Sequence, residues 1–93
     1  MSFNIGDMVK SKSGRDKGNI FLIVAVENEY LYLCDGKIRD INKPKKKKEK
    51  HVTLFKSEQN RTTEKIKNGD FVTNAELRKA INKALGITLK GGD

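Results

Sequence analysis

The sequence has few of the residues that carry metal and catalytic chemistry. Its 93 residues include one cysteine, one histidine and no tryptophan. These counts leave too few ligands for a zinc site and too few thiols for a disulfide framework. They also leave too few nucleophile–base pairs for a Ser/His/Asp triad of the usual kind. We therefore expect no catalytic residues, no metal and no cofactor.

The sequence also lacks a long apolar run. The longest one, residues 20–26, has the length of a strand and falls far short of the roughly 20 residues that span a bilayer. The N-terminus has no cationic patch that leads into an apolar core, so we expect no secretory signal. Cys34 stands alone in an apolar segment, which is typical of a buried, inert thiol in a reducing cytosol. We expect a cytoplasmic protein without a membrane partner.

Acidic residues are the scarcer charge, with 12 Asp and Glu against 20 Lys and Arg and a net charge of +8. Residues 37–56 contribute +7 of that charge, because they hold nine basic residues and only Asp40 and Glu49. The nine are Lys37, Arg39, Lys43, Lys45, Lys46, Lys47, Lys48, Lys50 and Lys56. So dense a cluster indicates either a polyanionic partner or a solvated, flexible loop.

Short apolar segments separated by turns predict an antiparallel β-barrel in the first half of the chain. The predicted strands are residues 8–13, 20–26, 30–34, 37–41 and 51–55. Residues 20–26 are apolar on both faces, so we expect this strand in the middle of the sheet. Asp35 and Gly36 are expected to form a tight hairpin turn. Pro44 ends the pattern and the lysines after it are too charged to bury, which predicts a basic loop at 43–50.

The second half predicts a helix that packs on the barrel. Residues 57–70 are polar and are expected to contain at most a helical turn near residue 68. Thr73 and Glu76 have the spacing of a capping box. Apolar residues then recur at helical spacing, at Leu77, Ala80, Ile81, Ala84 and Leu85. The predicted organisation is a barrel over residues 1–56, and a polar connector with a helix at about 74–85 over residues 57–93.

Several sequence stretches resemble a known family. The segment G-D-M-V at residues 6–9, followed by G-R-D-K-G at residues 14–18, resembles the KOW motif. Residues 35–39, residues 43–48 with His51, and residues 73–80 resemble small bacterial KOW proteins related to eukaryotic-type large-subunit ribosomal proteins. The resemblance implies a mainly β, SH3-like antiparallel barrel with a C-terminal α-helical extension. It also implies RNA contacts through strand ends and loops.

The basic residues of these stretches are the candidate RNA-binding residues. Lysines neutralise phosphates without reading bases, whereas Arg15 and Arg39 can form a fork onto a phosphate or stack on an unpaired base. Tyr30 and Tyr32 share one strand face and either stack bases or pack in the core or at its rim. The full candidate set is Arg15, Lys17, Lys37, Arg39, Lys43, Lys45, Lys46, Lys47, Lys48, Lys50 and His51.

The sequence therefore predicts a monomeric, non-catalytic RNA-binding protein whose partner is ribosomal RNA or the ribosome. Selectivity is expected to come from RNA shape. The alternative is a protein-interaction module of the translation or transcription machinery that binds ribosomal or polymerase proteins.

Overall fold

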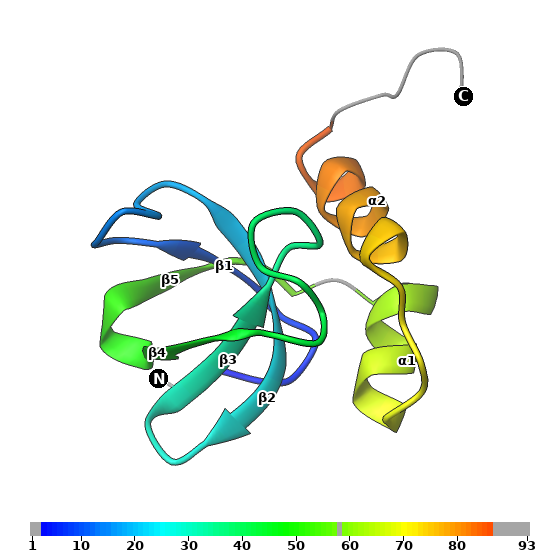
Figure 1. The fold of residues 1–93 in the computed structure, drawn as a ribbon, viewed down its shortest axis with the longest axis horizontal. Helices are drawn as coiled ribbons and strands as arrows, with labels where there is room; N and C mark the ends of the chain where they lie inside the picture. Colours follow the sequence, from blue (N-terminus) through cyan, green and yellow to red (C-terminus); the bar gives the residue numbers. More distant parts are fainter. Residues whose placement is uncertain (1–2, 58, 87–93) are drawn as a thin grey trace.

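The structure, a computed structural model, describes residues 3–57 and 59–86 and is a five-stranded antiparallel sheet with two helices (Figure 1). The hydrogen-bonded strand order is β4-β3-β2-β1-β5. The strands are β1 (Met8–Ser11), β2 (Ile20–Glu27), β3 (Tyr30–Cys34), β4 (Lys45–Lys48) and β5 (Val52–Lys56). A 3₁₀ helix, η1 (Glu49–His51), precedes β5, and the helices α1 (Arg61–Asn68) and α2 (Asn74–Ala84) follow it.

The sheet curls into a small β-barrel-like form. Strands β4 and β5 occupy opposite edges of the sheet, yet only the three residues of η1 join them. A flat five-stranded sheet would hold its edges about 19 Å apart, too far for so short a connection. Register shifts in β1 and β2 provide the local irregularity that a strongly curved sheet requires.

The central strand β2 packs on both of its faces, as its apolar sequence predicts. Phe21 and Ile23 point to one face and contribute to a cluster with Val9, Leu31 and Leu33. The alternate residue of β2, Leu22, belongs instead to a second cluster together with residues of both helices. The protein therefore has one core inside the curled sheet and another between the sheet and the helices.

The helices cover the outer face of the sheet, and α2 confirms the prediction from its capping box. The Thr73 hydroxyl accepts from the Glu76 amide at 3.1 Å, and the Glu76 carboxylate accepts from the Thr73 amide at 3.0 Å. Four of the five expected apolar residues of α2 are buried, whereas Leu85 is 43% exposed. Helix α1 is longer than the helical turn expected there, and begins with a reciprocal cap between Asn60 and Thr63.

Three local predictions are wrong. Residues 37–41 form no strand, because the Asp35 carboxylate accepts hydrogen bonds from the Lys37 and Arg39 amides, both at 2.9 Å, and holds them in a loop. Asp35 and Gly36 therefore form no tight hairpin turn, since a loop over residues 35–44 connects β3 to the next strand. The fourth strand is instead the lysine run, where a basic loop was expected. Residues 45–48 pair with β3, from Leu33 opposite Lys45 to Tyr30 opposite Lys48.

Cys34 is fully buried between the sheet and the helices, as its sequence context predicts. Burial, followed by the nearby charges of Asp35 and Asp40, raises the pKa of this thiol to about 12. The thiol is therefore protonated and unreactive at neutral pH.

Candidate nucleic-acid interface

A tight turn between β1 and β2 presents two basic side chains, Arg15 and Lys17. Gly14 and Gly18 flank them with φ angles of 82° and 92°, in the left-handed region that favours glycine. The Gly18 amide donates to the Ser11 carbonyl at 2.9 Å, which closes the turn at the end of β1. The turn is therefore a defined support for the two cations.

Asp16 anchors this turn to the lysine strand β4. Its carboxylate lies 2.8 Å from the Lys45 ammonium and 2.9 Å from that of Lys47, and it accepts from the Ser11 hydroxyl at 2.7 Å. Burial alone raises the pKa of Asp16, but the hydrogen bonds from Lys45, Ser11 and Lys47 together hold it well below its usual range. Lys45 and Lys47 are thus partly neutralised, and the turn is tied to β4.

Lys47 is buried, so the expectation that the lysine run is too charged to bury is wrong for this residue. The residue is only 8% exposed, and its ammonium donates to the Ser13 carbonyl at 3.0 Å as well as to Asp16. A buried ammonium is tolerated because both partners lie within hydrogen-bonding distance. Lys47 is a structural residue, and its buried ammonium is already engaged by protein acceptors.

Three candidate residues from separate segments line one groove of about 300 Å³, which we call the turn groove. Arg15 comes from the turn, Arg39 from the loop after β3, and Lys45 from the start of β4. Among residues 3–57 and 59–86, the guanidinium groups of Arg15 and Arg39 have no hydrogen-bond or ion-pair partner. The remaining wall residues are Asp16, Asn19, Phe21 and Ile38.

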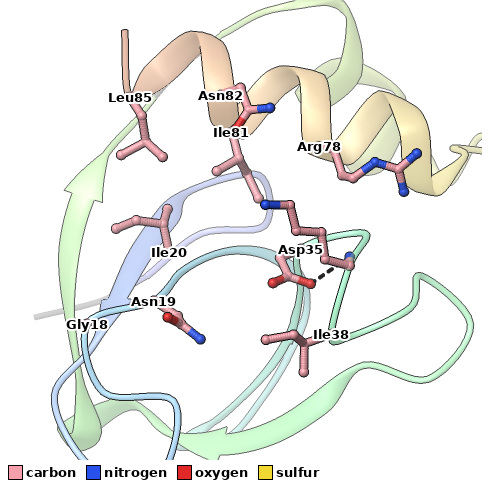
Figure 2. Close-up of a pocket in the computed structure, with 10 residues that line it drawn as sticks. Gly18, Asn19, Ile20, Asp35, Ile38, Arg78, Ile81, Asn82 and Leu85 are labelled. Atoms are coloured by element: carbon pink, nitrogen blue, oxygen red, sulfur yellow. Dashed lines mark hydrogen bonds between the residues drawn. The ribbon is translucent and has the colours of Figure 1, made fainter. Parts of the chain in front are cut away.

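A second groove of about 310 Å³, the helix groove, lies between the sheet and α2 (Figure 2). It shares Asn19 and Ile38 with the turn groove, so the two are neighbours on one surface. Its other wall residues are Gly18, Ile20, Asp35, Lys37, Arg78, Ile81, Asn82 and Leu85. Figure 2 shows Ile81 and Asn82 on the helix, and Leu85 just after its end, opposite Asn19 and Ile38.

The loop at residues 35–43 is held in place by α2. The Arg78 guanidinium donates to the Gly36 carbonyl at 2.6 Å. The Asn74 side chain accepts from the Ile41 amide at 2.8 Å and donates to the Asp40 carboxylate at 2.9 Å. The backbone hydrogen bond from Asn42, with the bond from Asn74, lowers the pKa of Asp40. The helix therefore fixes the loop that carries Lys37 and Arg39.

The other half of the lysine strand makes a separate surface. Lys46 and Lys48 lie over the Tyr30 ring, with their ammonium nitrogens 4.5 and 5.7 Å from its centre. The Tyr32 hydroxyl donates to Glu27 at 2.9 Å. Both tyrosines are half-buried and belong to neither core cluster, so they lie at the rim.

The last candidates lie outside the two grooves. Lys43 and Lys50 are exposed, and His51 is half-buried in η1. Lys50 lines a different depression with Phe3 and Leu54. The turn groove thus brings together Arg15, Arg39 and Lys45. Lys37 lies in the helix groove, which shares Ile38 with the turn groove. The structure does not gather all eleven candidates at one site.

Several site residues were not found from the sequence. Asp16 had a visible signal, an acid between two cations in a turn, but its partners are 29 and 31 residues away. Asn19, Ile38 and Arg78 gave no signal, because only the fold places them on the grooves. Arg78, for example, reaches a carbonyl 42 residues earlier.

Comparison with known proteins does not identify a family for this chain. The sequence matches no protein-family model, and no curated protein matches it. Within the described ranges, no group of three or more His, Cys, Asp or Glu residues could hold a metal ion. No helix in the same ranges is long and apolar enough to cross a membrane.

Proposed function

We propose that this protein is a non-catalytic RNA-binding protein that holds RNA phosphates in the turn groove. The observation that carries the proposal is the convergence of Arg15, Arg39 and Lys45 on that groove. The two arginines have unused hydrogen-bond donors there, and a guanidinium binds phosphate through a planar, two-pronged contact. A polyanion neutralises the positive charge of the groove and also accepts hydrogen bonds from its free donors.

We also propose that the fold is an SH3-like barrel of the KOW type. The curled five-stranded sheet, with a single 3₁₀ turn between its last two strands, supports this assignment. So does the G-R-D-K-G turn between β1 and β2, which carries Arg15 and Lys17. Ribosomal RNA or a ribosome-associated complex in the cytoplasm is then the partner that the resemblance implies.

The mechanism divides the basic residues by role. Arg15 and Arg39 fix the position of the RNA backbone in the turn groove, while Lys37 in the adjoining helix groove and the exposed Lys17 of the turn add positive charge. Lys46 and Lys48 add long-range attraction from the neighbouring strand face. Lys45 and Lys47 hold the turn against β4 through Asp16, so their contribution to RNA affinity is smaller than their charge suggests.

The test compares two variants that remove the same charge. Arg15→Gln with Arg39→Gln removes two cations from the turn groove, and Lys79→Gln with Lys83→Gln removes two cations of α2 outside both grooves. Binding to a labelled RNA hairpin is followed by fluorescence anisotropy over a range of salt concentrations. The arginine variant should lower the slope of log K against log salt by about 0.7–0.9 for each lost contact.

Two outcomes contradict the proposal. One is an equal loss of affinity in both double variants, which would leave only non-specific attraction. The other is cosedimentation with ribosomes that survives digestion of the RNA, which would favour the alternative of a protein-interaction module.

A further inference from the structure

Ile38 is an apolar side chain in a charged surface. It is 72% exposed, and it forms part of the wall of both grooves. Its sequence neighbours, Lys37 and Arg39, also line the grooves, one on each side. A single exposed isoleucine is ordinary on a protein surface. An isoleucine at the boundary of two grooves that each contain basic residues suits a ligand that is both anionic and apolar.

The loop that carries Ile38 is preorganised. Besides the two bonds that the Asp35 carboxylate accepts, the Arg39 carbonyl accepts from the Asp35 and Gly36 amides at 3.1 and 3.0 Å. Arg78 and Asn74 fasten the same loop to α2. Because these bonds already fix the backbone, a ligand that contacts Ile38 loses little free energy to ordering the loop.

The helix groove beside Ile38 is lined by both apolar and polar side chains, among them the charged residues Asp35, Lys37 and Arg78. Ile81 and Asn82 of α2 line it, as does Leu85 directly after the helix, and Figure 2 shows the Asn19 amide between Ile20 and Ile38. Apolar side chains next to polar groups suit the flat face of a nucleobase together with its hydrogen-bonding edge. The adjacent turn groove supplies the free guanidinium groups that a phosphate needs.

On the basis of the RNA-binding function proposed above, we propose that the two grooves bind an unpaired nucleotide. Its phosphate lies in the turn groove against Arg15 and Arg39, and its base lies in the helix groove against Ile38. Paired bases are stacked inside a duplex, where Ile38 cannot reach their faces. The surface therefore distinguishes single-stranded or looped RNA from a continuous duplex.

The Tyr30 face is a weaker place for such a base. Lys46 and Lys48 already lie over that ring, so an incoming base would have to displace them.

The experiment measures two RNAs and four variants of the full chain by fluorescence anisotropy, the fourth being Arg39→Gln in the turn groove. The RNAs are a single-stranded oligouridine and a blunt RNA duplex of the same length. Ile38→Ala should weaken binding to the single strand by about fivefold and leave the duplex unchanged, and Ile38→Phe should tighten binding to the single strand, since base contacts with a ring are stronger. Phe71→Ala is the control, because Phe71 is 78% exposed and outside both grooves.

The outcomes separate this proposal from the function on which it rests. Unchanged single-strand affinity in Ile38→Ala, together with a loss in Arg39→Gln, overturns the nucleotide site and leaves RNA binding in place. Equal losses for both RNAs, or an equal loss in Phe71→Ala, also overturn it. A wild-type protein that binds neither RNA overturns both proposals.

Discussion

At the scale of single residues, Asp16 decides how the lysine run behaves. Its carboxylate bonds two lysines of β4 and the Ser11 hydroxyl, and all of these contacts are at most 2.9 Å long. Without that charge, the buried Lys47 ammonium would keep only the Ser13 carbonyl. An uncompensated buried charge is among the costliest single changes in a protein.

We therefore expect Asp16→Asn to lower the free energy of unfolding by about 3 kcal/mol. Urea unfolding followed by circular dichroism measures the change. The matched control is Glu29→Gln, because Glu29 also faces a lysine of β4, but at 4.0 Å and with its side chain 65% exposed. A surface pair of this kind contributes at most about 1 kcal/mol. Equal effects of the two substitutions would contradict the anchoring role of Asp16.

At the scale of elements, α2 has two functions that its sequence pattern does not separate. Its apolar face covers the sheet, whereas Asn74 and Arg78 hold the loop at residues 35–43. The fit is close at Gly36, where a Cβ atom would collide with the Asn74 carbonyl oxygen, and where φ is +78°. The backbone of this loop touches the first turn of the helix.

Gly36→Ala should therefore lower the free energy of unfolding by more than the strain of an alanine at a left-handed φ alone. Gly69→Ala is the control, because Gly69 has φ +76° but no atom within 4 Å of the position that a Cβ atom would take. The strain shared by the two substitutions costs about 1–2 kcal/mol. The difference between their free energies of unfolding measures the contact of the loop with α2. Gly36→Ala should also weaken RNA binding, and identical behaviour of the two variants would contradict this account.

At the scale of the whole molecule, carboxylates join elements that are distant in the sequence. Asp16 joins the first turn to β4, and Glu76 joins α2 to α1 through Lys65 at 2.7 Å. That bond, then the Thr73 amide, lowers the pKa of Glu76 from 4.5 to about 2. Since these carboxylates hold protons less tightly in the folded state, the unfolded chain binds more protons in acid.

Stability should therefore fall as the pH drops below about 4.5 and should continue to fall toward pH 2. Thermal unfolding midpoints measured across this range give the dependence. A variant with Asp16→Asn and Glu76→Gln should show a shallower fall than the wild type, although it starts from a lower stability. A wild-type midpoint that does not change over this range would contradict the contribution of these carboxylates.

Much of the fold could be predicted from local pattern. Residues 20–26 form a strand because their apolar side chains pack on both faces, and residues 30–34 form one because their apolar side chains pack mainly on one face. The capping box of Thr73 and Glu76 fixes the start of α2. The error at residues 37–41 has a local cause, since the Asp35 carboxylate competes for the amides of a potential strand. The error at 45–48 has a distant one, because Asp16, which pairs with Lys45 and Lys47 of this strand, lies 29 and 31 residues earlier in the sequence.

The candidate site, like the fold, could be predicted only in part from the sequence. By itself the sequence determined that positive charge is concentrated in residues 37–56 and that Arg15 sits on a glycine-flanked turn, since both are properties of neighbouring residues. Only the tertiary structure decided which charges face a groove and which are used internally. The curl of the sheet and the clamp from α2 set those distances, and they bring Arg15, Arg39 and Lys45 to one groove while Lys47 is buried against Asp16.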